Sequence, residues 1–170
     1  LSKNMTQDIY FKMISDKTAS LFSASCKLGA ITATDDLDKI NALQNFGEYL
    51  GLGFQIKDDL FDLIGNISNT GKPSGYDLKR NLLTLPLIYI LDNKSSISKR
   101  TFKLQLKLLL KKNKFNDIKE LIISEGGIEY AENKLLEISK KARVELEIFE
   151  DSNVKSAMIE ILEFNLVRNV

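Results

Sequence analysis

Four polar side chains between Gln55 and Asp62 have the types and the spacing to bind a metal ion. In a helix, Gln55, Asp58, Asp59 and Asp62 share one side, because steps of three and four residues return to the same face. The neighbouring positions are mostly apolar. Carboxylates crowded on a largely buried helix repel one another, and a hard divalent cation removes that penalty. The stretch therefore predicts Mg²⁺ binding in preference to a solvated acidic face.

A long helix is predicted to carry these groups, from the acidic cluster at 34–38 to about Ile64. Thr34 or Asp35 would cap its start, where carboxylates suit the helix dipole. This first cluster lacks the spacing of the later one, so we interpret it as a helix start rather than a metal site. The apolar stripe of the helix is supplied by Ile40, Leu43, Phe46, Leu50 and Phe54.

Glycines interrupt the interior of this helix at Gly47, Gly51 and Gly53. Each costs about 1 kcal/mol relative to alanine inside a helix. Such a cost indicates that a neighbouring helix or a ligand comes close to the backbone. The sequence favours neither explanation over the other.

Two lysines flank the acidic helix in the sequence. Lys17, followed by Thr18, falls in the middle of a helix predicted from 7 to 29, although alone it would be taken for a surface lysine. Lys72 lies in a polar loop that follows the acidic helix. Apolar residues at helical intervals predict further helices over 82–91, 102–110, 118–123, 128–149 and 154–167.

The composition excludes several classes of function. The 170 residues carry 24 Lys and Arg against 23 Asp and Glu, so a net charge of +1 offers no overall field for nucleic acid. Histidine is absent, which excludes His-based serine triads and His-ligated metals. The lone Cys26 excludes an internal disulfide framework and fits a reducing compartment. We therefore expect a cytoplasmic globular protein in which Cys26 is a packed thiol.

No part of the sequence has the length of a membrane span or the form of a signal peptide. A basic run occupies residues 111–114 (KKNK). Cations suit the C-terminal end of a helix, so a solvated helix end is the simpler interpretation. A phosphate or membrane role for this run is the minor alternative.

Three segments, in order, resemble motifs of the trans-polyprenyl diphosphate synthases. Residues 51–62 (GLGFQIKDDLFD) are similar to the second Asp-rich motif of that family, with its Phe-Gln-x-x-Asp-Asp-x-x-Asp core. Residues 17–22 (KTASLF) with 29–30 (GA) resemble its upstream Lys-Thr segment. Residues 71–78 (GKPSGYDL), followed by 84–86 (TLP), resemble the loop after the acidic helix. The resemblance covers nearly all of this chain but only the C-terminal portion of the family.

The resemblance implies an all-α fold of the isoprenoid-synthase type, a helical bundle. Residues 1–170 would then be the C-terminal portion of one helical domain. The implied reaction is chain elongation, in which an allylic diphosphate ionises, isopentenyl diphosphate attacks the carbocation through its double bond, and a proton is lost. The implied partners are these two diphosphates and a second copy or the absent N-terminal half.

The same resemblance assigns roles to individual side chains. Asp58 would ligate Mg²⁺ directly, and Asp59 and Asp62 would bind it directly or through water. Three further residues, Lys17, Thr18 and Lys72, would contact the diphosphate, and Gln55 would contact the allylic end of the substrate. Metal ions and lysines are needed because a leaving pyrophosphate carries heavy negative charge.

Two departures from the family pattern shape the expected function. The first Asp-rich motif of the family is absent here, as are its upstream basic residues, so we expect half a site and little or no turnover from residues 1–170 alone. Leu82 stands where the family usually has lysine, which should weaken pyrophosphate binding. The alternative hypothesis is therefore a non-catalytic partner subunit of a heteromeric prenyl synthase, and a helical scaffold without a ligand ranks last.

Overall fold

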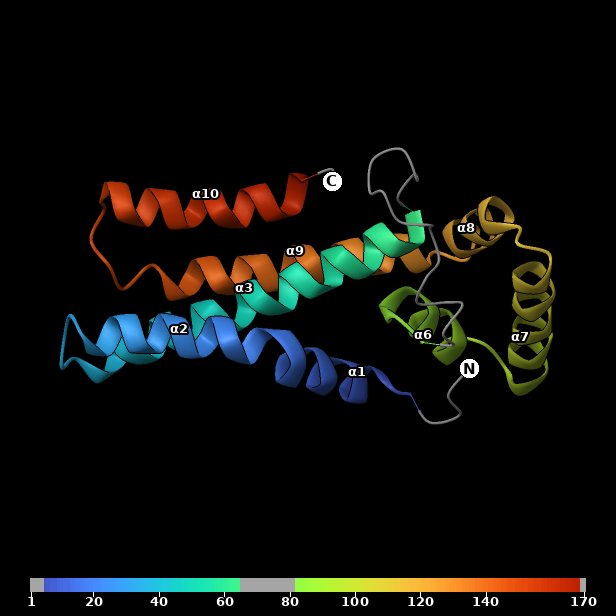
Figure 1. The fold of residues 1–170 in the computed structure, drawn as a ribbon, viewed down its shortest axis with the longest axis horizontal. Helices are drawn as coiled ribbons and strands as arrows, with labels where there is room; N and C mark the ends of the chain where they lie inside the picture. Colours follow the sequence, from blue (N-terminus) through green and yellow to red (C-terminus); the bar gives the residue numbers. More distant parts are fainter. Residues whose placement is uncertain (1–4, 65–81, 169–170) are drawn as a thin grey trace. The chain divides into compact units, whose positions relative to one another are not determined.

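The computed structural model describes residues 5–64 and 82–168, and within these ranges every regular element is helical (Figure 1). The prediction of an all-α fold is confirmed over this part of the chain. The elements are α1 (Gln7–Ile14), the π-helical turn η1 (Ser15–Ala19), α2 (Ser20–Ile31), α3 (Leu37–Ile64), α6 (Leu85–Asp92), α7 (Ser96–Lys111), α8 (Phe115–Ser124), α9 (Gly127–Glu145) and α10 (Asn153–Val167).

Two predictions about helix ends need correction. The predicted helix over 7–29 is interrupted by η1, in which the hydrogen bonds span five residues instead of four. The long acidic helix is described over Leu37–Ile64, but its cap is neither Thr34 nor Asp35. Its predicted end at about Ile64 stays a prediction, because the described residues stop there. Asp36 caps it, because its carboxylate accepts hydrogen bonds from the backbone N–H groups of Asp38 and Lys39 at 3.0 and 3.3 Å.

Contacts divide the chain into two compact units, each described here by itself. Unit 1 comprises 1–10, 58–132 and residue 170, and unit 2 comprises 11–57 and 133–169. The expectation that residues 1–170 form one domain stays a prediction. None of the described helices combines the length and the apolar character that crossing a membrane would require.

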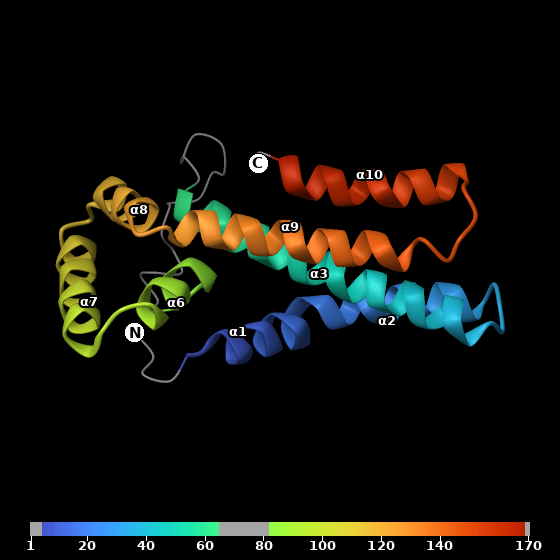
Figure 2. The same ribbon diagram turned by 180° about the vertical axis from the view of Figure 1, so that it is seen from behind.

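In unit 2, α2 runs alongside the first part of α3, as both views show (Figures 1 and 2). A Cβ on Gly47 would lie 2.6 Å from the carbonyl oxygen of Phe22, and a Cβ on Gly51 would lie 2.5 Å from the Cα of Ala19. These two glycines therefore permit backbone-to-backbone packing of helices, which answers a question that the sequence left open. A second contact joins α3 to α9 and α10 through a core of Phe46, Ala142, Leu146 and Leu162.

In unit 1, α6 is the most deeply buried helix and has apolar residues on most sides, which include Leu85, Leu87, Ile88, Ile90 and Leu91. Helices α7 and α8 bury narrower stripes, Phe102 with Leu106 and Ile118 with Ile122. The start of α9 packs on α6, since a Cβ on Gly127 would meet Ile90 and the carbonyl of Pro86.

Candidate functional site

All four polar residues of the predicted metal-binding stretch lie within α3. Gln55 and Asp59 are buried, with 9% and 7% of their surface exposed, whereas Asp58 and Asp62 are half-buried. Positions 55, 58, 59 and 62 of one continuous helix share a side. The helix thus presents an amide and three carboxylates together, as the sequence predicted.

In unit 2, two of the predicted site residues are in direct contact. The hydroxyl of Thr18 donates a hydrogen bond to Oε1 of Gln55 at 2.7 Å. Thr18 belongs to η1, and so does Lys17, whose side chain is exposed. With Oε1 occupied by this bond, the amide nitrogen of Gln55 is oriented away from Thr18. This hydrogen bond therefore fixes the orientation of the Gln55 side-chain amide, with its oxygen toward Thr18.

The π-helical turn is attached to α3 at two further points. The hydroxyl of Ser15 donates to Oε1 of Glu48, and Ala19 lies against Gly51. Single π turns inside α-helices often occur at functional sites. Here the π-helical turn contains Lys17 and Thr18. Apart from these two candidate site residues, the sequence gives no sign that the helix is irregular at this point. The participation of Glu48 was not predicted.

In unit 1, Asp59 has a partner that sequence reasoning missed. The hydroxyl of Tyr10 donates to Oδ2 of Asp59 at 2.7 Å, and Tyr10 is fully buried. Tyr10 lies in the segment predicted as a helix over 7–29, where it was given no polar role. A buried carboxylate is costly unless it is hydrogen-bonded, and this hydroxyl offsets part of that cost. No periodicity could reveal the pair, because 49 residues separate its members.

The donor chemistry of α3 fits a Mg²⁺ ion that is shared with phosphate groups. Among the described residues, no group of three His, Cys, Asp or Glu side chains is arranged to hold a metal ion. Mg²⁺ in phosphate sites usually takes only one or two carboxylates and completes its shell with phosphate and water. Asp58, Asp59 and Asp62 supply oxygen ligands of that kind. These carboxylates would therefore supply part of the ligand shell of such an ion rather than a closed protein cage.

The other residues singled out by the sequence add little to the description of the site. Lys72 lies outside the described residues. Leu82 is exposed, and the hydroxyl of Thr84 is buried without a hydrogen-bond partner among the described residues. Cys26 packs against the core of α3, α9 and α10, and burial raises the pKa of its thiol, as expected of a packed cysteine.

Comparison with known proteins identifies relatives along the whole chain. The sequence profile of the family described as polyprenyl synthetase matches residues 1–124. The short chain isoprenyl diphosphate synthase of Methanothermobacter thermautotrophicus is 33% identical over 168 residues, covering 97% of this chain and 50% of that protein. Heptaprenyl diphosphate synthase component 2 of Bacillus subtilis is 36% identical over 142 residues, covering 78% of this chain and 41% of that protein.

Solved structures agree with these sequence similarities. A crystal structure of polyprenyl synthase from Caulobacter crescentus, complexed with calcium and isoprenyl diphosphate, superposes on this chain with a TM-score of 0.86. The two are 29% identical, and the match covers 98% of this chain and 51% of that one. The chain thus spans about half the length of the curated relatives it matches. Both η1 and α3, with their polar side chains, lie inside the family match.

Proposed function

Because this chain belongs to the polyprenyl synthetase family, we propose that it is the C-terminal part of a polyprenyl diphosphate synthase. That enzyme extends an allylic diphosphate with isopentenyl diphosphate. The observation that carries the proposal is on α3, where Gln55 is bonded to Thr18 and three carboxylates follow within two turns. The Caulobacter crescentus relative, complexed with a divalent cation and isoprenyl diphosphate, supports this ligand chemistry.

The roles of the side chains follow from their chemistry. Asp58, Asp59 and Asp62 would hold Mg²⁺, which when bound neutralises the charge that builds up on a leaving diphosphate. Tyr10 keeps the Asp59 carboxylate in one orientation through its hydrogen bond. Directed carboxylates are useful here because they need no rearrangement when the charge develops.

The η1 turn would contact both the diphosphate and the organic part of a substrate. Lys17 is exposed and offers an ammonium to diphosphate oxygens. Thr18 fixes Gln55, which is buried and offers its amide toward the allylic end. Lys72 would contribute a second ammonium. We further infer a cytoplasmic protein that works as a homodimer or with its N-terminal half.

Titration of inorganic pyrophosphate into this chain, with Mg²⁺ and with EDTA, tests the half-site. We expect binding that requires the metal and that weakens about tenfold or more in an Asp58→Ala, Asp59→Ala variant, the usual scale of a lost metal-site contact. The matched control replaces Asp35 and Asp38, exposed acids at the start of α3, with alanine and should bind as the parent does. Metal-independent binding, or no binding by the folded protein, would contradict the proposal.

One observation favours a second candidate, a non-catalytic partner subunit. Leu82 occupies a position where the resemblance predicts a lysine, and the side chain is exposed rather than buried in a core. The name of the Bacillus subtilis relative marks it as one component of an assembly. Intact masses of the purified complex distinguish the two, since a different polypeptide beside this chain supports the subunit and an upstream piece of the same product supports the synthase.

A further inference from the structure

The positive charge of this chain is concentrated on α7 and its flanks. Between Asp92 and Asp117 the sequence has no Asp or Glu, although the chain as a whole has 23 of them against 24 Lys and Arg. Eight of the basic residues lie in this stretch, namely Lys94, Lys99, Arg100, Lys103, Lys107, Lys111, Lys112 and Lys114. A chain with a net charge of +1 therefore contains one strongly cationic segment.

Helix α7 also has two apolar faces instead of one. Phe102 and Leu106 are buried in unit 1 and attach the helix to its core. On the opposite side, Ile97, Leu104 and Leu108 are 81%, 59% and 51% exposed. Two residues advance a helix by about 200°, so Leu104 and Leu108 each point away from Leu106. Packing within unit 1 explains only the first face.

Basic side chains border the outward apolar stripe. Arg100, Lys107 and Lys111 are exposed, and each stands three or four residues from Leu104 or Leu108, which places them beside the stripe. Lys94 and Lys114 are used within unit 1, in ion pairs with Glu125 and Asp117. The bordering cations form no such pair within the described ranges, 5–64 and 82–168.

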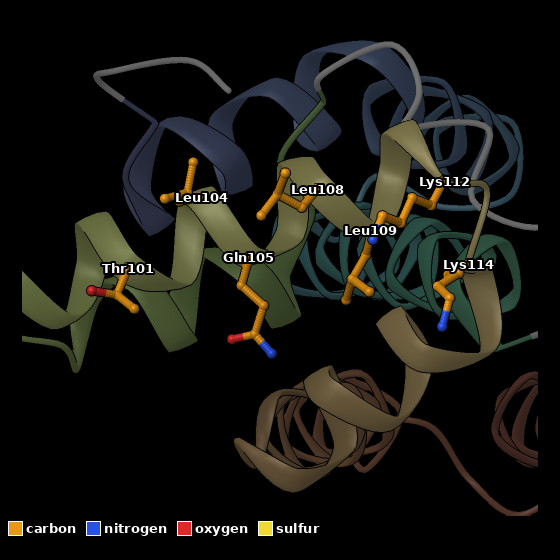
Figure 3. A pocket seen from close by; sticks show the side chains of 7 residues that line it. All are labelled: Thr101, Leu104, Gln105, Leu108, Leu109, Lys112 and Lys114. Carbon is orange, nitrogen blue, oxygen red and sulfur yellow. The ribbon is translucent and has the colours of Figure 1, made fainter.

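A hollow of about 400 Å³ continues this surface at the C-terminal end of α7. Leu104, Leu108 and Leu109 line it, and Lys112 and Lys114 stand at one end, as Figure 3 shows. The figure also shows Leu104 and Leu108 projecting from one side of the helix. The apolar walls are suited to contact acyl chains, and the ammonium groups at the edge are suited to contact anionic head groups.

We propose that the outward face of α7 is a docking surface for an anionic lipid bilayer. Helices that lie in a membrane interface combine an apolar face with Lys and Arg, and they gain affinity from both apolar burial and attraction to anionic lipids. Charge complementarity favours a bilayer as the partner. Its acyl chains would cover the apolar stripe, and its anionic head groups would lie against the lysines and arginine that border the stripe. A protein partner that binds by surrounding an isolated basic helix is excluded, because Phe102 and Leu106 are buried and attach α7 to the rest of unit 1.

Sedimentation with vesicles tests this face without any need for catalysis. The protein should bind vesicles of phosphatidylcholine with phosphatidylglycerol and not vesicles of phosphatidylcholine alone. Binding should fall as salt is raised, because screening weakens surface attraction. A Lys107→Gln, Lys111→Gln variant should bind about 25-fold more weakly, since each basic residue near such a surface contributes about 1 kcal/mol, or about fivefold.

A second variant, Leu104→Ser with Leu108→Ser, separates apolar insertion from charge and should lose about tenfold or more. The matched control is Ile161→Ser with Phe164→Ser on α10, an equally exposed apolar pair that has Glu160 and Glu163 as neighbours. This control should bind as the parent does, and circular dichroism verifies that each variant is folded.

Three results would overturn the proposal. Equal binding to both kinds of vesicle would remove the electrostatic component, and unchanged binding by the α7 variants would place the contact elsewhere. Absence of vesicle binding, together with a change of self-association or of a co-purified protein in the leucine variant, would assign the face to a protein partner.

Discussion

Two stretches of α3 depart from an ordinary helix composition, and they do so for different reasons. The stretch 47–53 contains three glycines, and the stretch 55–62 contains three aspartates. At Gly47 and Gly51 the structure leaves no space for a Cβ, because backbone atoms of Phe22 and Ala19 occupy it. At Asp59 it supplies a buried hydroxyl instead. The first departure is a packing requirement, and the second is a polar arrangement that a ligand would complete.

The difference teaches which substitutions should cost stability and which should cost binding. Glycine substitutions change only the distance between two helices, so their effect appears in the free energy of unfolding. Substitutions of the polar side chains divide into those that break a hydrogen bond of the folded protein and those that remove a group offered to a ligand. Four experiments separate these cases, in order of decreasing effect.

The largest loss of stability is expected from Gly51→Ala. Its new Cβ would lie 2.5 Å from the Cα and 2.9 Å from the Cβ of Ala19, so α2 or η1 must move. Overpacking of this kind costs about 3 kcal/mol or more when backbone atoms are in the way. Urea denaturation measures it. The control is Gly29→Ala on α2, where a new Cβ would have no atom within 4 Å beyond the adjacent backbone of its own helix, and alanine should add about 1 kcal/mol. Similar values for both variants would contradict the packing explanation.

A smaller loss is expected from Tyr10→Phe, which removes the hydroxyl bonded to Asp59. Hydrogen bonds to charged groups contribute about 1.5–3 kcal/mol. A double-mutant cycle with Asp59→Asn measures the coupling between the two side chains. Tyr130→Phe is a suitable control in the same unit, because its hydroxyl donates to the neutral Gln7 and should contribute only about 1 kcal/mol. Equal losses of stability in Tyr10→Phe and Tyr130→Phe would mean that a hydrogen bond to the Asp59 carboxylate contributes no more than one to a neutral amide.

Thr18→Val should cost about 1 kcal/mol of stability, the contribution of one neutral hydrogen bond. Valine keeps the shape of threonine but leaves Oε1 of Gln55 without this donor. If Gln55 faces substrate, the same variant should weaken binding of an allylic diphosphate analogue, while Thr18→Ser should restore it. A stability loss without any change in analogue binding would make this contact purely structural.

The smallest effect is expected at the start of α3. Hydrogen bonds from the backbone N–H groups of Lys39 and Asp38 hold the pKa of Asp36 below its usual range. A carboxyl with a lowered pKa in the folded state adds stability above its unfolded pKa, and this contribution is lost as pH falls through the folded value. Asp36→Ala should therefore flatten the acid side of the stability–pH profile. An unchanged profile would mean that another group titrates there.

Sequence reasoning succeeded where a pattern is local. The helical course of α3 up to Ile64 and the shared face of its polar residues follow from helical periodicity. The hydrogen bond between Thr18 and Gln55 was not predicted. The resemblance gave each residue a substrate contact, and nothing in their types makes them neighbours. For the glycines of α3, the sequence indicated that something approaches the backbone closely, but it did not identify the neighbouring residues.

Other features have no local signature. Asp36 replaced the predicted caps because Thr34, Asp35 and Asp36 are all acceptable capping residues, and only the path of the incoming chain selects one. The hydrogen bond from Tyr10 to Asp59 depends on tertiary packing that periodicity does not specify. The outward stripe of α7 was visible as helical leucines, but exposure was needed to distinguish it from core.

The π-helical turn has a consequence for the phase of the helix in which it lies. Buried residues occur at Tyr10, Ile14, Ala19 and Ser23, so the interval between them lengthens from four residues to five across the turn and then returns to four. Each residue turns an α-helix by about 100°. In a regular α-helix, the additional residue between Ile14 and Ala19 would rotate the following face by that angle, and the wider π-helical turn accommodates it. Removing Asp16 would leave four-residue intervals that a regular α-helix satisfies, so the irregular turn is what lets the chain contain this additional residue and still bury one continuous face.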